Sequence, residues 1–253
     1  MVSLRPHRIA RGVALRADMA RHRGDAVYCP LCTRSFDAFK DAPDIALGLC
    51  RRCGSHARHR AQWLLFESRP ELLAEIKSLL HLAPEWALRR RLREVGHLRY
   101  VTADLDQPGV DLHLDLTAAD AEVADASFEG VICSHVLEHI PDDRAAMRHL
   151  CRITAPAGWC LVMVPLDLAR TETYEDPSIT TAEARHRAFW RPDHVRLYAP
   201  DIEERLQAAG FMVERIQPYA AFGEERCRRC SIGPFEELWL CRPQRAGAAV
   251  TER

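Results

Sequence analysis

Short apolar segments alternate with amphipathic ones between residues 78 and 166, and this alternation constrains the fold more than any other feature. The apolar segments are rich in Val, Ile and Leu and occupy residues 78–83, 98–104, 128–134 and 158–166. Residues 84–95 and 142–153 have the apolar spacing of helices. Buried strands that alternate with helices are typical of a doubly wound sheet, so we predict an α/β fold with a mostly parallel sheet.

The segments around this alternation set the predicted domain boundaries. Before it we predict a helix at residues 58–77 that is interrupted near Pro70. After it we predict a long polar insertion at 167–196, a helix at 201–210 and a closing pair of strands at 211–218 and 235–243. We predict that residues 1–60 form a basic N-terminal segment with a small metal-binding domain. Residues 61–243 then form the α/β domain, and residues 244–253 form a flexible tail.

Two Cys-x-x-Cys pairs define the predicted metal site. Cys29 and Cys32 form one pair, Cys50 and Cys53 form the other, and seventeen residues separate the pairs. Each pair forms a tight turn that points two thiolates at one ion, and Gly54 suits the positive φ of such turns. Four thiolates in a tetrahedral array make a closed structural zinc site. We therefore predict a small N-terminal domain that binds structural Zn²⁺ through these four cysteines.

Other metal-ligating residue types receive different interpretations. His56 and His59 follow the second cysteine pair, and we interpret them as residues at a helix start or on the surface, because a four-cysteine site needs neither. Cys227 and Cys230 form a third Cys-x-x-Cys pair, which lacks enough partner ligands even if Cys241 joins it. We interpret that pair as a surface or incidental redox feature.

Four groups of residues follow the ends of predicted strands. They are the loop 81–85, Asp104, the pair Asp115–Leu116 and the pair Ser134–His135. Open parallel sheets bind ligands beyond the C-terminal ends of their strands, near the point where strand order reverses. Asp104 lies nineteen residues after Glu85, a spacing that suits a carboxylate that accepts hydrogen bonds from ribose hydroxyls. Taken together and in this order, the four groups predict a cofactor that contains a nucleoside. For Asp104 taken alone, the alternative of a turn residue that only ends its strand stays open.

Residues 79–165 resemble the class I S-adenosylmethionine-dependent methyltransferases, particularly those that act on small molecules. The segment "SFEGVICSHVLEHIPDD", residues 127–143, is similar to the signature of that family, and "HLCRITAPAGWCLVMVPL" follows it in the same order. The four-cysteine head and the later "FWRPDHVRLYAPDIEERLQAAGF" resemble a subgroup with a zinc knuckle. The resemblance implies a Rossmann-like fold, methyl transfer and S-adenosylmethionine as cofactor.

The resemblance also implies roles for individual residues. Asp104 matches the acid that binds the ribose. Asp115 and Leu116 match the adenine site. Ser134 and His135 match positions that line the methyl-transfer pocket.

The loop "HLAPEWA", residues 81–87, lacks the glycines of the family's first motif. Glycines let a backbone approach a pyrophosphate, whereas S-adenosylmethionine carries an ammonium, a carboxylate and a sulfonium. Pro84 suits the first helical turn, and Glu85 complements the helix dipole and can pair with an ammonium. We predict that His81, Ala83, Pro84 and Glu85 hold the methionine end of the cofactor. The alternative that Glu85 only caps its own helix stays open.

The predicted catalytic residues are His135 and His194. A sulfonium is already activated, so alignment supplies much of the rate, and a base is needed for a hydroxyl or carbon-acid acceptor. The alternative for His194 is a structural turn before the last helix. His139 lies four residues after His135, with Glu138 between them, but the spacing fixes no third ligand for a second metal. We therefore interpret this pair of histidines as structural or substrate-facing, and a second metal stays an alternative.

The charge distribution leaves the acceptor class open. Residues 1–60 hold 12 Lys and Arg against 5 Asp and Glu, and the remainder holds 23 against 31. The excess of basic side chains in residues 1–60 either contacts a polyanion or only keeps the surface of a small domain solvated. We predict a cytoplasmic enzyme with a small-molecule acceptor and no membrane contact. The alternatives are an RNA methyltransferase, for which only Tyr28, Phe36 and Phe39 are candidate base-stacking residues, and a methyltransferase-like binding protein that has lost catalysis.

Overall fold

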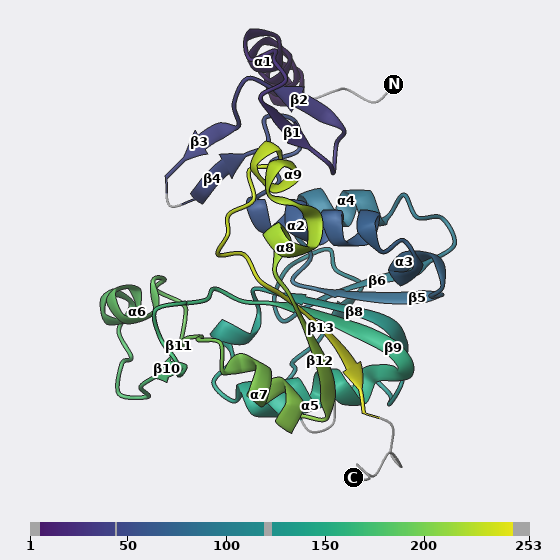
Figure 1. Ribbon diagram of the computed structural model, residues 1–253, viewed down its shortest axis with the longest axis vertical. Helices are drawn as coiled ribbons and strands as arrows, with labels where there is room; N and C mark the ends of the chain where they lie inside the picture. Colours follow the sequence, from purple (N-terminus) through teal and green to yellow (C-terminus); the bar gives the residue numbers. More distant parts are fainter. Residues whose placement is uncertain (1–5, 44, 119–122, 245–253) are drawn as a thin grey trace. The chain divides into compact units, whose positions relative to one another are not determined.

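The structure is a computed structural model that describes residues 6–43, 45–118 and 123–244 (Figure 1). The chain divides into two compact units. The first unit consists of the described residues up to Arg69 with Glu85–Glu94 and Pro218–Glu236. The second unit consists of Pro70–Pro84, Val95–Gln217 and the described residues from Glu237 onward. Each unit is therefore assembled from segments that are separate in the sequence.

The second unit is built on one twisted sheet. Its strands are β5 (Ser78–Leu82), β6 (Arg99–Asp104), β7 (Leu112–His113), β8 (Phe128–Ser134), β9 (Thr154–Met163), β12 (Phe211–Ile216) and β13 (Leu238–Pro243). The strand order is β12-β13-β9-β8-β5-β6-β7, and only β13 runs antiparallel to its neighbours. The prediction of a doubly wound, mostly parallel sheet is confirmed.

The strand order reverses at β5. From β5 the chain passes to β6 and β7 on one side, and then returns to β8 and β9 on the other. β5 pairs in parallel with both β6 and β8, so the C-terminal ends of all three strands meet at one edge of the sheet. This is the position at which open α/β sheets bind their ligands.

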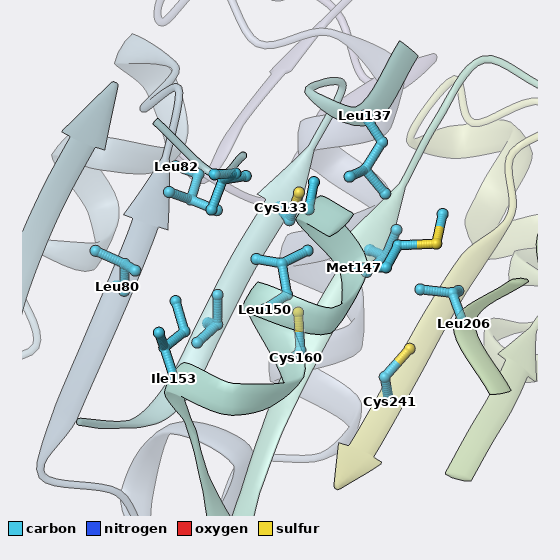
Figure 2. Packing of buried hydrophobic residues seen from close by; sticks show 14 of the residues in the cluster. Leu80, Leu82, Cys133, Leu137, Met147, Leu150, Ile153, Cys160, Leu206 and Cys241 are labelled. Carbon is cyan, nitrogen blue, oxygen red and sulfur yellow. The ribbon is translucent and has the colours of Figure 1, made fainter. Parts of the chain in front are cut away.

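Helices α5 (Asp143–Ile153) and α7 (Ile202–Ala208) lie along one face of this sheet (Figure 1). Figure 2 shows how Met147, Leu150 and Ile153 of α5 point at side chains of the strands, among them Leu80 and Cys133. All five side chains are fully buried. Burial of each such side chain is worth about 1.5 to 3 kcal/mol, so this face fixes the strands whose ends carry the candidate site.

The predicted polar insertion at 167–196 has structure of its own. It contains α6 (Ala182–Phe189) and β10 (Tyr174–Glu175), which pairs antiparallel with β11 (Arg196–Leu197). Ion pairs attach it to α7: the carboxylate of Glu175, which is 41% exposed, accepts from Arg205 at 3.2 Å and from Arg196 at 3.0 Å. Arg205 also donates to the buried Asp143 of α5 at 3.0 Å, so the insertion is tied to both helices through this arginine.

The first unit consists of short antiparallel strand pairs and helices. Its strands are β1 (Val27–Cys29), paired with β2 (Arg34–Phe36), and β3 (Lys40–Ala42), paired with β4 (Ile45–Leu49). Its helices are α1 (Pro6–Arg21), α2 (Ala57–Ser68), α4 (Trp86–Leu92), α8 (Pro218–Phe222) and α9 (Glu224–Arg229).

The division into units differs from the predicted domain boundary at residue 60. Helix α2 contacts β4, α4 and α8, so it belongs with the N-terminal strands rather than with the sheet. The predicted break of the helix 58–77 is present: α2 ends at Ser68, and Pro70 precedes the short α3 (Glu71–Ala74) of the second unit. The sequence pattern located the elements but not the unit to which each belongs.

Two further predictions concern the chain end and membranes. Residues 245–253 of the predicted tail lie outside the described residues. Gln244, the first residue of that tail, donates a hydrogen bond from its backbone N–H to the backbone carbonyl of Gly210 at 2.8 Å. Within the described ranges, no helix combines the length and the apolar character needed to cross a membrane.

Candidate functional site

The thiols of the four predicted zinc ligands lie together in the first unit. Cys29 Sγ is 3.6 Å from Cys53 Sγ, and Cys32 Sγ is 3.5 Å from Cys50 Sγ. The four sulfurs lie within 4.8 Å of one another, and all four residues are buried. A tetrahedral Zn²⁺ with Zn–S bonds of about 2.3 Å places its sulfurs about 3.8 Å apart. The cluster therefore has the chemistry and the dimensions of a four-thiolate zinc site.

Two matching turns aim the thiols. The backbone N–H of Thr33 donates a hydrogen bond to the backbone carbonyl of Cys29 at 2.8 Å, and the backbone N–H of Gly54 donates to the backbone carbonyl of Cys50 at 2.8 Å. Both donors have left-handed backbone angles, φ 54° at Thr33 and 68° at Gly54. The sequence indicated the glycine only, because Thr33 has no residue-type signal for this conformation. Ser55 Oγ, 3.2 Å from Cys29 Sγ, adds a hydrogen-bonding group to the cluster.

The remaining histidines and cysteines of the first unit lie outside this cluster. His56 precedes α2, and its backbone N–H donates to His59 Nδ1 at 3.1 Å, so the predicted place at a helix start is confirmed. Cys227 and Cys230 are buried, at 0% and 2% exposure, so their interpretation as a surface pair is wrong. Both cysteines lie on the inner side of the short segment around α9, which spacing alone did not indicate.

The opening loop of the second unit uses a left-handed residue where the family has glycine. Ala83 has φ 45°, and its backbone N–H donates to Ala103 at 2.8 Å. His81 is fully buried in β5, and its Nδ1 lies 2.7 Å from the hydroxyl of Tyr100. Pro84 is buried and ends this segment of the second unit. The loop therefore bends sharply at Ala83, and Tyr100 of β6 holds the His81 ring.

Glu85 belongs to the first unit and has partners there. It precedes α4, but its side chain makes no capping hydrogen bond. Its carboxylate accepts a hydrogen bond from Arg58 Nε at 2.8 Å and lies 2.5 Å from His59 Nε2. A cofactor ammonium would compete with these two groups for the carboxylate, whose observed contacts are structural.

Asp104 ends β6 at the sheet edge where strand order reverses. Its Oδ1 accepts hydrogen bonds from the backbone N–H groups of Asp106 and Gln107, at 3.0 and 2.9 Å. Among the described residues none binds its Oδ2. The carboxylate is thus held in place by its own loop through Oδ1.

Asp115 and Leu116 follow β7 but point into different surroundings. Asp115 is exposed, and its Oδ1 accepts from the backbone N–H and the hydroxyl of Thr117, both at 2.7 Å. The backbone hydrogen bond from Thr117, the larger cause, and that from its hydroxyl lower the pKa of Asp115. Leu116 is 4% exposed and belongs to the hydrophobic core. Of the two, only Asp115 presents polar atoms at the surface.

Ser134 and His135 lie where β8 ends, next to β5. Ser134 is buried and pairs in register with Met163 of β9. His135 has a left-handed φ of 55°, and its backbone N–H donates to Met163 at 2.8 Å. A histidine in this conformation is unusual and is found disproportionately at functional sites. The bend turns the side chain of His135 out of the strand direction.

The two predicted catalytic histidines meet at a residue that the prediction did not include. His135 Nδ1 is 3.2 Å from Oε1 of Glu138, which lies in the 3-10 turn η1 (Leu137–His139) and is 1% exposed. His139 and His194 stack edge to face, with ring centroids 4.8 Å apart. The ligand atoms of Glu138, His139 and His194 lie within 4.8 Å of one another. Two segments about 55 residues apart thus form one polar cluster at the end of β8.

The cluster is held together by buried backbone contacts. Val195 N–H donates to the carbonyl of Glu138 at 2.9 Å, and Arg196 donates to the carbonyls of Leu137 and Pro141 at 2.9 and 2.8 Å. Burial raises the pKa of Glu138, but the hydrogen bond and charge of His135 outweigh it, and the net pKa lies below the ordinary value. Glu138 is therefore a buried carboxylate at the edge of the sheet that holds the candidate site.

A family model described as a methyltransferase domain matches residues 85–216, more than half of the 253-residue chain. The chain belongs to this methyltransferase family. It is an S-adenosylmethionine-dependent methyltransferase, as the resemblance of residues 127–143 predicts. The match begins at Glu85, within the loop 81–87 that lacks the usual glycines. No curated protein matches the sequence.

Several solved structures share features of this methyltransferase. One is 1,6-didemethyltoxoflavin-N1-methyltransferase of Burkholderia thailandensis, with bound S-adenosylhomocysteine, at 16% identity and TM-score 0.48, covering 75% of this chain and 79% of that one. Another is the [4+2]-cyclase SpnF, at 12% identity and TM-score 0.49, covering 93% of each chain. A third belongs to the complex of the Haloferax volcanii Trm112 methyltransferase activator and a putative methyltransferase, at 14% identity and TM-score 0.48, covering 76% of this chain and 96% of that one. Similarity at this level does not assign an acceptor.

Proposed function

We propose that this methyltransferase transfers the methyl group of S-adenosylmethionine to a small molecule at the edge of its second unit, and that the first unit holds a structural Zn²⁺. The observation that carries the proposal is the placement of Asp104 and His135 at the ends of β6 and β8, the two strands that flank β5. That edge is where the topology favours a nucleoside cofactor.

The chemistry of the residues at this edge fits the cofactor. The Oδ2 of Asp104 suits the ribose hydroxyls, because a carboxylate accepts hydrogen bonds from two neighbouring hydroxyl groups. The left-handed Ala83 allows the bend that glycine usually supplies. Asp115 offers a carboxylate for the adenine amino group, while Leu116 supports the loop from the core. The observed pairing of Glu85 with Arg58 and His59 favours a structural role for that residue.

The bound cofactor supplies a methyl group on a sulfonium that needs no further activation. The protein has to hold the acceptor in line and to exclude water. The carboxylate of Glu138 lies beside Nδ1 of His135 and orients the imidazole ring. The other ring nitrogen of His135, Nε2, is then the one that can face an acceptor. His135 is thus the proposed catalytic residue at the β8 end. His194 lies on the other side of Glu138 within the same cluster.

The four-cysteine cluster supports a structural role for the zinc. Four sulfur ligands complete a tetrahedral shell and leave no position for a substrate. The cluster also joins two separate turns of the first unit, the one between β1 and β2 and the one between β4 and α2. Metal binding therefore contributes directly to the folding of the first unit.

The contacts of three aromatic residues count against an RNA acceptor. Phe36 and Phe39 are buried, at 2% and 6% exposure, and Arg60 covers the Phe39 ring at 4.3 Å. Tyr28 has the guanidinium of Arg229 at 5.8 Å from its ring centroid. Readers of single-stranded RNA stack unpaired bases on exposed aromatic rings. Phe36 and Phe39 are therefore not accessible for such stacking, and Tyr28 is half-buried.

Calorimetric titration tests the proposal. Zinc-loaded protein is titrated with S-adenosylmethionine and with S-adenosylhomocysteine, and we expect binding of both. A folded, zinc-loaded sample that binds neither would contradict the enzyme and favour a binding protein that has lost catalysis. Retention on a phosphate-rich resin with a steep dependence on salt would instead favour a polyanionic acceptor.

A further inference from the structure

The cluster of Glu138, His139 and His194 is a set of metal-binding side chains apart from the four cysteines. Their ligand atoms lie within 4.8 Å of one another. Glu138 and His194 are 1% and 5% exposed, while the side chain of His139 is 38% exposed. Two buried ligands and one ligand open to solvent leave an approach for an ion and for a molecule bound to it.

Both histidines have one ring nitrogen engaged outside the cluster. His194 Nδ1 is 2.9 Å from the backbone carbonyl of Phe189. A carbonyl only accepts hydrogen bonds, so Nδ1 carries the proton and Nε2 keeps its lone pair. His139 Nδ1 likewise lies 3.3 Å from the carbonyl of Asp193. Metal-ligating histidines characteristically donate the second ring N–H in this way.

The carboxylate of Glu138 has little else to bind. Among the described residues its side chain has one partner, His135 Nδ1 at 3.2 Å from Oε1, and its Oε2 receives no hydrogen bond. A buried carboxylate in this state is costly unless it is paired or ligates a cation. The cluster thus contains an under-coordinated anion with two imidazole nitrogens beside it.

We propose that Glu138, His139 and His194 bind a divalent transition ion, Zn²⁺ or a chemically similar one. Two imidazoles and one carboxylate are a ligand set that such ions use in open sites, with a remaining position for substrate. Ligands of a tetrahedral Zn²⁺ lie about 3.4 Å apart, so the side chains would draw together by at most about 1.4 Å. The exposed His139 can make most of that movement.

The place of the ion suggests the class of acceptor, an inference that rests on the proposed function. Turn η1 follows β8 directly, so the open position lies beside His135 at the proposed methyl-transfer edge. An ion there orients an acceptor through an oxygen donor, such as a hydroxyl next to a carbonyl. In the transfer the acceptor hydroxyl gives its proton to Nε2 of His135, its oxygen bonds to the methyl carbon, and the electron pair of the broken carbon–sulfur bond stays on sulfur.

Metal stoichiometry tests the site without an activity assay. Protein is saturated with Zn²⁺, freed of excess ion and analysed for bound zinc, and Co²⁺ spectra separate the thiolate site from one with nitrogen and oxygen ligands. We expect two ions per chain in the wild type and one in Glu138→Gln and in His194→Ala. His186→Ala, an exposed histidine of the same insertion, is the matched control and retains two ions.

One ion per chain in the wild type would overturn the metal site, and so would two ions in His194→Ala. Circular dichroism and retained zinc at the four cysteines show whether each variant is folded, and His139→Ala provides a third variant if one is not. The cofactor titration is separate: loss of cofactor binding with two ions bound would contradict the proposed function and not the metal site.

Discussion

Arg60 Nε donates a hydrogen bond to the backbone carbonyl of Cys230 at 2.6 Å and joins two positions 170 residues apart in the sequence. The same guanidinium donates to the carbonyls of Ser55 at 2.5 Å and Ser231 at 2.9 Å. Arg60 itself is 0% exposed. One buried cation thus ties the turn after the second cysteine pair to the C-terminal segment of the first unit.

Replacing Arg60 should destabilise the first unit strongly. In Arg60→Met the carbonyls of Cys230 and Ser231 lose their donor, whereas the carbonyl of Ser55 keeps the backbone N–H of Cys50 at 3.0 Å. Each buried group left without a partner costs about 1 to 3 kcal/mol, so we expect the free energy of unfolding of the zinc-loaded protein to fall by at least about 2 kcal/mol in urea titrations. Arg52→Met, at an exposed arginine, is the control. Equal losses in the two variants would refute this role.

Removal of the proposed structural Zn²⁺ should unfold the first unit. Cys50→Ser takes one ligand from a closed site, and we expect it to lose one zinc ion per chain together with hydrogen-exchange protection in residues 45–69. Cys151→Ser changes a half-buried free thiol in the second unit and serves as control. Full protection of residues 45–69 in zinc-free protein would show that the cysteines do not need an ion.

Glu85→Gln separates the structural from the cofactor role of that residue. The substitution keeps the size of the side chain but removes the charge that pairs with Arg58 and His59. We expect a loss of about 1 to 3 kcal/mol in unfolding free energy, the range of a charge-assisted hydrogen bond. Calorimetry on the same variant should give nearly unchanged affinity for S-adenosylmethionine. A tenfold weaker affinity with unchanged stability would instead place Glu85 at the ammonium.

Protonation of the Glu175 carboxylate should lower the free energy of unfolding at acidic pH. Burial raises its pKa, but the hydrogen bonds and charges of Arg196 and Arg205 outweigh this effect, and the net pKa lies below the ordinary value. A carboxylate with a lowered pKa contributes stability above its unfolded pKa and loses it as the pH falls through the folded pKa. Unfolding free energies measured below about pH 5 should therefore fall less steeply in Glu175→Gln. The exposed Glu172→Gln should keep the wild-type slope, and an unchanged slope in Glu175→Gln would contradict the assignment.

The sequence predicted the elements whose signals are local. Apolar runs located β5, β6, β8 and β9, and the cysteine spacing identified ligands whose sulfurs lie within 4.8 Å of one another. The end of β6 at Asp104 followed from the same pattern. Such features depend on residues close in the sequence, so periodicity and spacing contain them.

Features that depend on distant segments were not predictable in this way. No pattern brings His194 to Glu138, because their contact depends on Arg196 and Val195 binding the carbonyls around η1. The burial of Cys227 and Cys230 depends on the return of residues 218–236 to the first unit. Chain topology decides these contacts, and one sequence does not encode them as a local signal.

The affinity of zinc-loaded protein for S-adenosylmethionine, measured by calorimetry in the wild type and in Asp104→Ala, tests the central claim most directly. Loss of the carboxylate removes the proposed partner of the ribose hydroxyls, and we expect binding at least about tenfold weaker, the scale of a lost charge-assisted hydrogen bond. Asp106→Ala, an exposed neighbour on the same loop, should bind like the wild type. Equal affinity in Asp104→Ala and the wild type would contradict the placement of the cofactor at the end of β6.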